Sequence, residues 1–139
     1  MIDLIQEPLS VLCDEVGVPV PQPDARGICT VVIDNQELRF VPLKQGKVVM
    51  LGIIGNAEAL AAKRNEDLQI VLASCLTLQG ARFAKLGTRE VMTLEPETGE
   101  LVLWQSFDPS TGVSISSFLG AAESMLNEVE YWKNWLAAS

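Results

Sequence analysis

The sequence predicts an α+β fold: helix, three strands, helix, two strands and helix, forming an antiparallel twisted sheet packed by the helices. Apolar residues near both ends of the chain recur every three or four positions, which is the period of an amphipathic helix. Between the ends, β-branched runs alternate with short polar turns, the pattern of antiparallel hairpins. The 139 residues are enough to bury a core, and we expect a single domain spanning 1–139.

The first expected element is a helix within residues 2–16. Pro8 fits the first turn of a helix whose regular part begins near Glu7, because a proline there sacrifices no hydrogen bond. Gly17 ends the helix. Prolines at 19, 21 and 23 then impose an extended connection. The apolar residues that set the helical period are Ile2, Ile5, Leu9, Leu12 and Val16.

Three strands are expected next, in residues 28–33, 37–41 and 47–54. The first two flank the polar pair Asp34 and Asn35, which is typical of a tight hairpin turn. A second turn covers 42–46. Strands joined by such short turns form an antiparallel meander.

The second half of the chain predicts helix, hairpin and helix. Residues 57–64 are alanine-rich and basic, and form a linker or a short helix. A helix over 66–79 ends at Gly80, and a hairpin pairs 88–94 with 101–107. The last helix begins after Ser114, a good N-cap residue.

The strands carry apolar residues on both faces, whereas a sheet with one exposed face alternates apolar with polar residues. Either helices cover both faces, or one face is left for a partner. We expect a partner to bind the first helix and first three strands. The 66–79 helix is apolar around more than one side, so a second copy of the chain is expected against it. The candidate partner-binding residues are Leu38, Phe40, Val49, Leu51 and Ile53, and the candidate dimer-interface residues are Leu68, Leu72 and Leu76.

The amino-acid composition excludes several kinds of catalytic site and ligand. The chain has no histidine and a net charge of −8. It therefore lacks histidine-based catalytic pairs, and it repels nucleic acid. Cys13, Cys29 and Cys75 form no CxxC pair and are expected to be buried, reduced thiols, as in a cytoplasmic protein. No catalytic residues, metal ligands, signal peptide or membrane span are predicted.

The chain resembles the class I type III secretion chaperones, the Tir-chaperone or CesT-like family. The likeness rests on element order, small size, acidity and four short stretches. These stretches are the helix ending Glu15-Val16-Gly17-Val18-Pro19, the strand and turn Val31-Val32-Ile33-Asp34-Asn35, the helix start Asn65-Glu66-Asp67-Leu68, and the final Glu130-Tyr131-Trp132-Lys133-Asn134-Trp135-Leu136.

The resemblance implies a bacterial cytoplasmic homodimer with no enzymatic activity and no cofactor. Such chaperones hold the N-terminal segment of a secreted effector in extended form, which prevents its aggregation and keeps it competent for export. Two alternatives stay open. One is a regulatory adaptor or anti-activator of the same fold that binds a regulatory protein. The other is a small enzyme of unknown type, disfavoured because no site motif is present.

Overall fold

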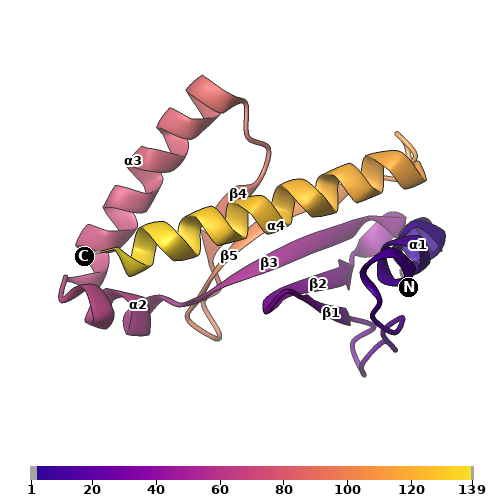
Figure 1. The fold of residues 1–139 in the computed structure, drawn as a ribbon, viewed down its shortest axis with the longest axis horizontal. Coiled ribbons are helices and arrows are strands. Elements are labelled where there is room, and N and C mark those ends of the chain that lie inside the picture. Colours follow the sequence, from indigo (N-terminus) through magenta and orange to yellow (C-terminus); the bar gives the residue numbers. More distant parts are fainter. Residues whose placement is uncertain (1–2, 139) are drawn as a thin grey trace.

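The structure is a computed structural model that describes residues 3–138. It confirms the predicted α+β class and element order (Figure 1). The elements are η1 (Asp3–Ile5), α1 (Gln6–Val16), β1 (Cys29–Ile33), β2 (Gln36–Pro42), η2 (Lys44–Gly46), β3 (Val48–Asn56), α2 (Ala57–Arg64), α3 (Leu68–Leu86), β4 (Val91–Leu94), β5 (Glu100–Phe107) and α4 (Ile115–Ala137).

The five strands form one antiparallel sheet in the order β1-β2-β3-β5-β4. Helices α1 and α4 pack together against one face of this sheet, and α4 runs obliquely across the strands (Figure 1). Their apolar side chains form one core with the residues of that face. The strands at the two edges are β1 and β4.

Helix α4 is the main cover of the sheet. Its buried residues recur at steps of four and three, so one stripe of the helix faces the strands. Ser114 caps its first turn, as predicted, in a reciprocal arrangement with Ser117. At the other end, Arg64 donates hydrogen bonds to the carbonyl oxygens of Trp135, Leu136 and Ala138.

The sheet lies very close to α4 at Gly52 in β3. A Cβ atom added there would lie 2.5 Å from Val129 Cγ2 and 2.8 Å from Met125 Sδ. Real Cβ atoms do not approach this closely, so only glycine allows the helix to lie directly on the strand backbone. Ile54 follows Gly52 on the same, helix-covered face and belongs to the core, and the register of β3 against β5 shifts between Ile53 and Gly55.

Helix α3 is longer than the sequence predicted, because it continues through Gly80 to Leu86. Nothing lies within 4 Å of a Cβ added at Gly80, so this glycine does not mark a tight turn. It weakens the helix only by its backbone entropy. The helix stops at Gly87, whose left-handed φ of 64° provides a C-cap.

Arg82 fixes the distal half of α3 to α4. Its guanidinium pairs with Glu128 at 2.5 Å and lies 3.6 Å from the centroid of the Tyr131 ring. Both charged side chains of the pair are largely shielded from solvent. A shielded ion pair reinforced by a cation–π contact holds α3 at a defined angle although it projects away from the sheet (Figure 1).

One other boundary differs from expectation, and the structure decides between the two alternatives left open for residues 57–64. Strand β4 begins at Val91, three residues later than predicted, because residues 87–90 form an irregular connection from α3. Residues 57–64 form a short helix and not a linker. The Asn56 side chain accepts a hydrogen bond from the Ala59 amide and so caps this helix.

Candidate partner-binding surface

The register of the sheet assigns each predicted residue to a face. Directly paired residues of antiparallel strands share a face, and alternate residues of one strand do so too. Leu38 pairs with Gly52 and Phe40 with Met50, so both lie on the face that α1 and α4 cover. Both are 0% exposed. The prediction that Leu38 and Phe40 contact a partner is therefore wrong, because the chain's own core already encloses them.

Val49, Leu51 and Ile53 lie on the opposite face. Leu51 pairs with Trp104 of β5, and Ile53 pairs with Val102. Val49, Leu51 and Trp104 are half-buried, whereas Ile53 and Val102 are buried. Neither Ile53 nor Val102 belongs to the cluster of core residues beneath the helices. These five residues, which we call the aliphatic sheet face, thus form a second apolar layer of the sheet.

An ion pair crosses the aliphatic sheet face. Arg39 of β2 reaches Glu100 of β5 at 3.2 Å, across the intervening strand β3, and also pairs with Glu37. Desolvation lowers the pKa of Arg39, but the hydrogen bonds to Glu37 and Glu100 outweigh it, so the pKa is raised overall. The guanidinium stays charged, and the apolar layer is bordered by a fixed polar group.

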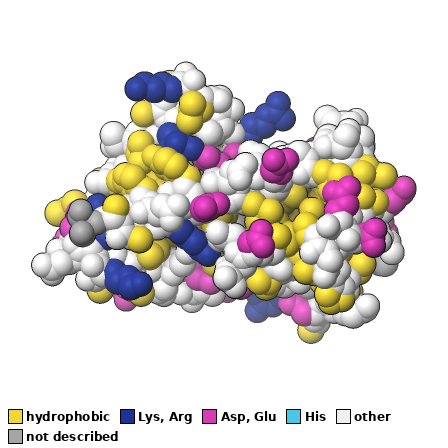
Figure 2. Space-filling model, in the orientation of Figure 1, with side chains coloured by type: hydrophobic (Ala, Val, Ile, Leu, Met, Phe, Trp, Pro, Cys, Tyr) yellow, Lys and Arg dark blue, Asp and Glu magenta, His cyan; other side chains and the backbone are white. Residues whose placement is uncertain are grey.

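Helix α3 carries the candidate dimer residues. Leu68 and Leu72 are half-buried against the chain, and Leu76 is 62% exposed. Phe83 follows Leu76 by seven positions and Leu86 follows three later, so these side chains share one side of the helix. Leu72, Leu76, Phe83 and Leu86 form what we call the α3 stripe, and hydrophobic side chains gather over α3 in Figure 2. The prediction named its first half and missed Phe83 and Leu86, because it ended the helix at Gly80.

A hollow of about 480 Å³ lies beside α1. It is lined by Leu9 of α1, by Val20, Pro21 and Pro23 of the extended connection, and by Cys29 at the start of β1. Asp24 at its rim accepts hydrogen bonds from the backbone amides of Ile28 and Arg26, which lowers its pKa. These hydrogen bonds fix the turn that follows the proline-rich connection, at one side of the hollow.

The three thiols are buried and none is in a disulfide. Burial raises the pKa of Cys75 to about 11 and raises the pKa values of Cys13 and Cys29. A thiol that stays protonated is a weak nucleophile and a poor metal ligand. Within residues 3–138, no group of three or more potential metal ligands comes together. None of the described helices combines the length and hydropathy needed to cross a membrane.

The fold and these surfaces define a small α+β protein that leaves apolar strand and helix residues for another molecule to cover. Residues 9–133 match the Tir chaperone protein (CesT) family. The chain belongs to this family, which confirms the resemblance inferred from the sequence. No curated protein sequence matches the chain.

Several solved structures share the fold. The chain in the ExsC–ExsE complex aligns with a TM-score of 0.72 and 17% identity, over 100% of this chain and 98% of the other. The chain in the HopA1–SchA chaperone–effector complex aligns with a TM-score of 0.66 and 16% identity, over 94% of each chain. The third structure is the Yersinia pestis type III secretion chaperone SycH in complex with a stable fragment of YscM2. It aligns with a TM-score of 0.57 and 15% identity, over 89% of this chain and 95% of the other.

Proposed function

We propose that this protein is a type III secretion chaperone that acts by binding alone, in the bacterial cytoplasm and as a homodimer. It holds the N-terminal segment of a secreted effector in extended form, which prevents aggregation and keeps the segment competent for export. The observation that carries the proposal is the aliphatic sheet face, because it is apolar and only partly covered by the chain itself. Family membership supports the same function.

The chemistry of the surface favours a polypeptide as the ligand. An extended segment presents side chains at alternate positions, and these fit between Val49, Leu51 and Trp104. The net charge of −8 disfavours the phosphate backbone of nucleic acid. The hollow beside α1 offers a second apolar contact on the first helix. Main-chain hydrogen bonds to an edge strand would add affinity without sequence selectivity.

The dimer is proposed to form through the α3 stripe. Four apolar side chains lie on one side of a helix that projects from the sheet, and most of them are exposed. A contiguous exposed apolar surface of this kind marks an interaction site. A second copy of the chain would bury the same stripe symmetrically. Leu72 and Leu76 are the first two residues of this stripe, and Leu68 precedes it by one helical turn.

The test is a co-purification from the native host with three variants. Leu51→Gln should weaken effector capture by about 1–3 kcal/mol while the thermal midpoint changes little, because the side chain is only half-buried. Ile115→Gln is the matched control: Ile115 is an exposed apolar residue at the start of α4, outside the aliphatic sheet face and the hollow beside α1, and this variant should capture the effector as the wild type does. Leu38→Gln should unfold the protein.

Mass spectrometry of the captured protein decides the function. A secreted protein whose N-terminal segment alone is retained supports the chaperone, whereas a small regulator retained in its place supports the adaptor. If Leu51→Gln captures its partner as well as the wild type does, the aliphatic sheet face is not the binding surface.

A further inference from the structure

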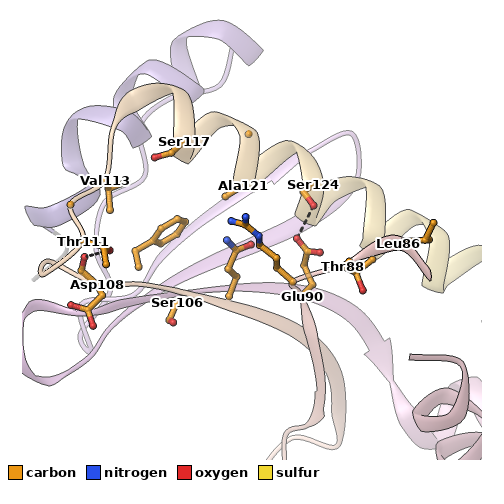
Figure 3. A pocket seen from close by; sticks show the side chains of 16 residues that line it. Leu86, Thr88, Glu90, Ser106, Asp108, Thr111, Val113, Ser117, Ala121 and Ser124 are labelled. Carbon is orange, nitrogen blue, oxygen red and sulfur yellow. Dashed lines mark hydrogen bonds between the residues drawn. The ribbon is translucent and has the colours of Figure 1, made fainter. Parts of the chain in front are cut away.

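A polar cavity of about 600 Å³ lies on the helix side of the molecule and adjoins the end of the α3 stripe at Leu86. Its walls are the connection after α3, the C-terminal part of β5 and the N-terminal half of α4 (Figure 3). Ser117, Ala121 and Ser124 reach it from α4, and Glu90 faces them from the connection. Family resemblance and sequence motifs assign no role to this cavity.

Glu90 is the unusual member of the cavity. It is 3% exposed, and it is the only buried charged residue among those the structure describes. Its Oε2 accepts a hydrogen bond from the Ser124 hydroxyl at 2.8 Å (Figure 3). Its Oε1 is buried and has no hydrogen-bond partner in residues 3–138. A buried carboxylate oxygen without a donor is destabilising, so it needs an explanation.

Gln105 adds a second acceptor. This residue lines the cavity, and its Oε1 is also buried without a hydrogen-bond partner among the described residues. The cavity therefore offers two free oxygen acceptors, and one of them belongs to an acidic side chain. A complementary ligand must supply at least two N–H donors, and a positive charge would balance the carboxylate.

No charged neighbour forms an ion pair with Glu90 among the described residues. Asp108 lines the cavity and pairs with Lys47 at 3.6 Å, so this lysine is engaged by another carboxylate. Arg89 lines the cavity too, but it is exposed and forms no ion pair with Glu90 in the part of the chain described. A bound water could satisfy a hydrogen bond, but it would leave the buried charge uncompensated.

We propose that this cavity binds a basic side chain, arginine or lysine, of the polypeptide that the chaperone holds. The proposal rests on the proposed function for the source of that side chain. Glu90 provides the charge and one acceptor, Gln105 provides the second acceptor, and Ser124 holds the carboxylate in place. The cavity then selects segments with a basic residue at one position, whereas the apolar surfaces select only for hydrophobicity.

The test uses short peptides, so it needs no identified effector. The wild-type protein, labelled with ¹⁵N, is titrated with acetylated, amidated Ala-Arg-Ala, Ala-Lys-Ala and Ala-citrulline-Ala. Citrulline has the shape of arginine without its charge. We expect saturable shifts of the Glu90, Gln105 and Ser124 amide resonances with the two basic peptides. The citrulline peptide should bind about tenfold more weakly or not at all, because charge-assisted hydrogen bonds are the stronger kind.

Two variants locate the effect. Glu90→Gln keeps an acceptor for Ser124 and removes the charge, and it should abolish the preference for arginine over citrulline. Glu97→Gln removes the same charge from the exposed hairpin turn and should keep the preference. If Glu90→Gln does not fold, the binding of the arginine and citrulline peptides to the wild type still tests whether the cavity prefers a positive charge.

Equal binding of all three peptides, or no saturable shift with any of them, overturns the proposal. Shifts that persist in Glu90→Gln place the basic group elsewhere and overturn it as well. The outcome is independent of effector capture: loss of the peptide preference leaves the chaperone function standing, and failure of effector capture leaves a basic-peptide site without its natural ligand.

Discussion

At the scale of single residues, burial decides the chemistry of the Cys75 thiol. Its pKa is raised from 9.0 to about 11 in the folded chain, because the thiolate is disfavoured away from water. The unfolded thiol therefore ionises at lower pH than the folded one. The stability linked to Cys75 is fully present below pH 9 and is lost as pH rises toward 11.

Chemical unfolding measured between pH 8 and pH 11 checks this expectation. The free energy of unfolding should fall by roughly 2–3 kcal/mol more in the wild type than in Cys75→Ala, since one pKa unit corresponds to about 1.4 kcal/mol. Cys75→Ala is the control because lysine and tyrosine side chains titrate in both proteins. Equal slopes for the two proteins would show that the thiol is accessible to water in the folded state.

The side of the sheet on which a residue lies could be predicted only in part. In β2, Glu37 and Arg39 alternate with Leu38 and Phe40. This alternation favours the two apolar residues as the covered face, and the prediction that they contact a partner did not take it into account. In β3 both faces are apolar, so the sequence gives no such signal. The pairing of Leu51 with Arg39 carries the information, and it exists only once the strands have aligned.

At the scale of elements, glycine has opposite meanings in α3 and β3. Gly80 lies in open space inside a regular helix, whereas Gly52 lies under α4. Gly80→Ala should stabilise the protein by about 0.5–1 kcal/mol, because alanine loses less backbone entropy on folding. Gly52→Ala should destabilise it by about 1–3 kcal/mol, because the stiff Val129 side chain must move.

Thermal unfolding of the two variants beside the wild type checks both signs. Each variant is the control for the other, because both replace glycine by alanine and only the surroundings of the two glycines differ. A stabilised Gly52→Ala variant would show that α4 does not rest on the β3 backbone.

The boundaries of α3 show why element ends are hard to predict. A glycine after an apolar helical run usually ends the helix, and Gly80 was interpreted so. Contacts distant in sequence override this preference: Arg82 pairs with Glu128, and the Gln79 side chain accepts a hydrogen bond from the Met92 amide at 2.5 Å. Both contacts stabilise helical backbone on either side of Gly80 and depend on elements that follow it in the chain.

At the scale of the whole molecule, the α3 stripe predicts a dimer. Leu76→Asp should convert a dimer into a monomer at micromolar concentration, because the charge would be buried in the interface without a partner. Ile70→Asp is the matched control: Ile70 is also exposed on α3, but it lies on another side of the helix. Light scattering after size-exclusion chromatography gives the mass of each variant. A monomeric wild type would contradict the dimer.

Size, acidity and the order of elements identified the family, because they depend on local patterns along the chain. The surfaces that contact other molecules could not be assigned in the same way. The aliphatic sheet face combines residues from β3 and β5, and the cavity at Glu90 combines the connection after α3 with α4. Such sites depend on contacts between segments distant in sequence, for which one sequence holds no periodic signal.

Because α4 lies directly on β3 at Gly52, the backbone at the centre of the molecule should open more slowly than the backbone at its edges. The amides of β3, with a paired strand on each side and α4 on its backbone, should be the last to exchange hydrogen for deuterium, at a rate set by global unfolding. The edge strands β1 and β4 and the projecting end of α3 can open without disturbing that centre. A partner that binds the folded chain should slow even the β3 amides, because it stabilises the native state against global unfolding. Edge segments that the partner does not contact should keep their own faster exchange, because they open locally.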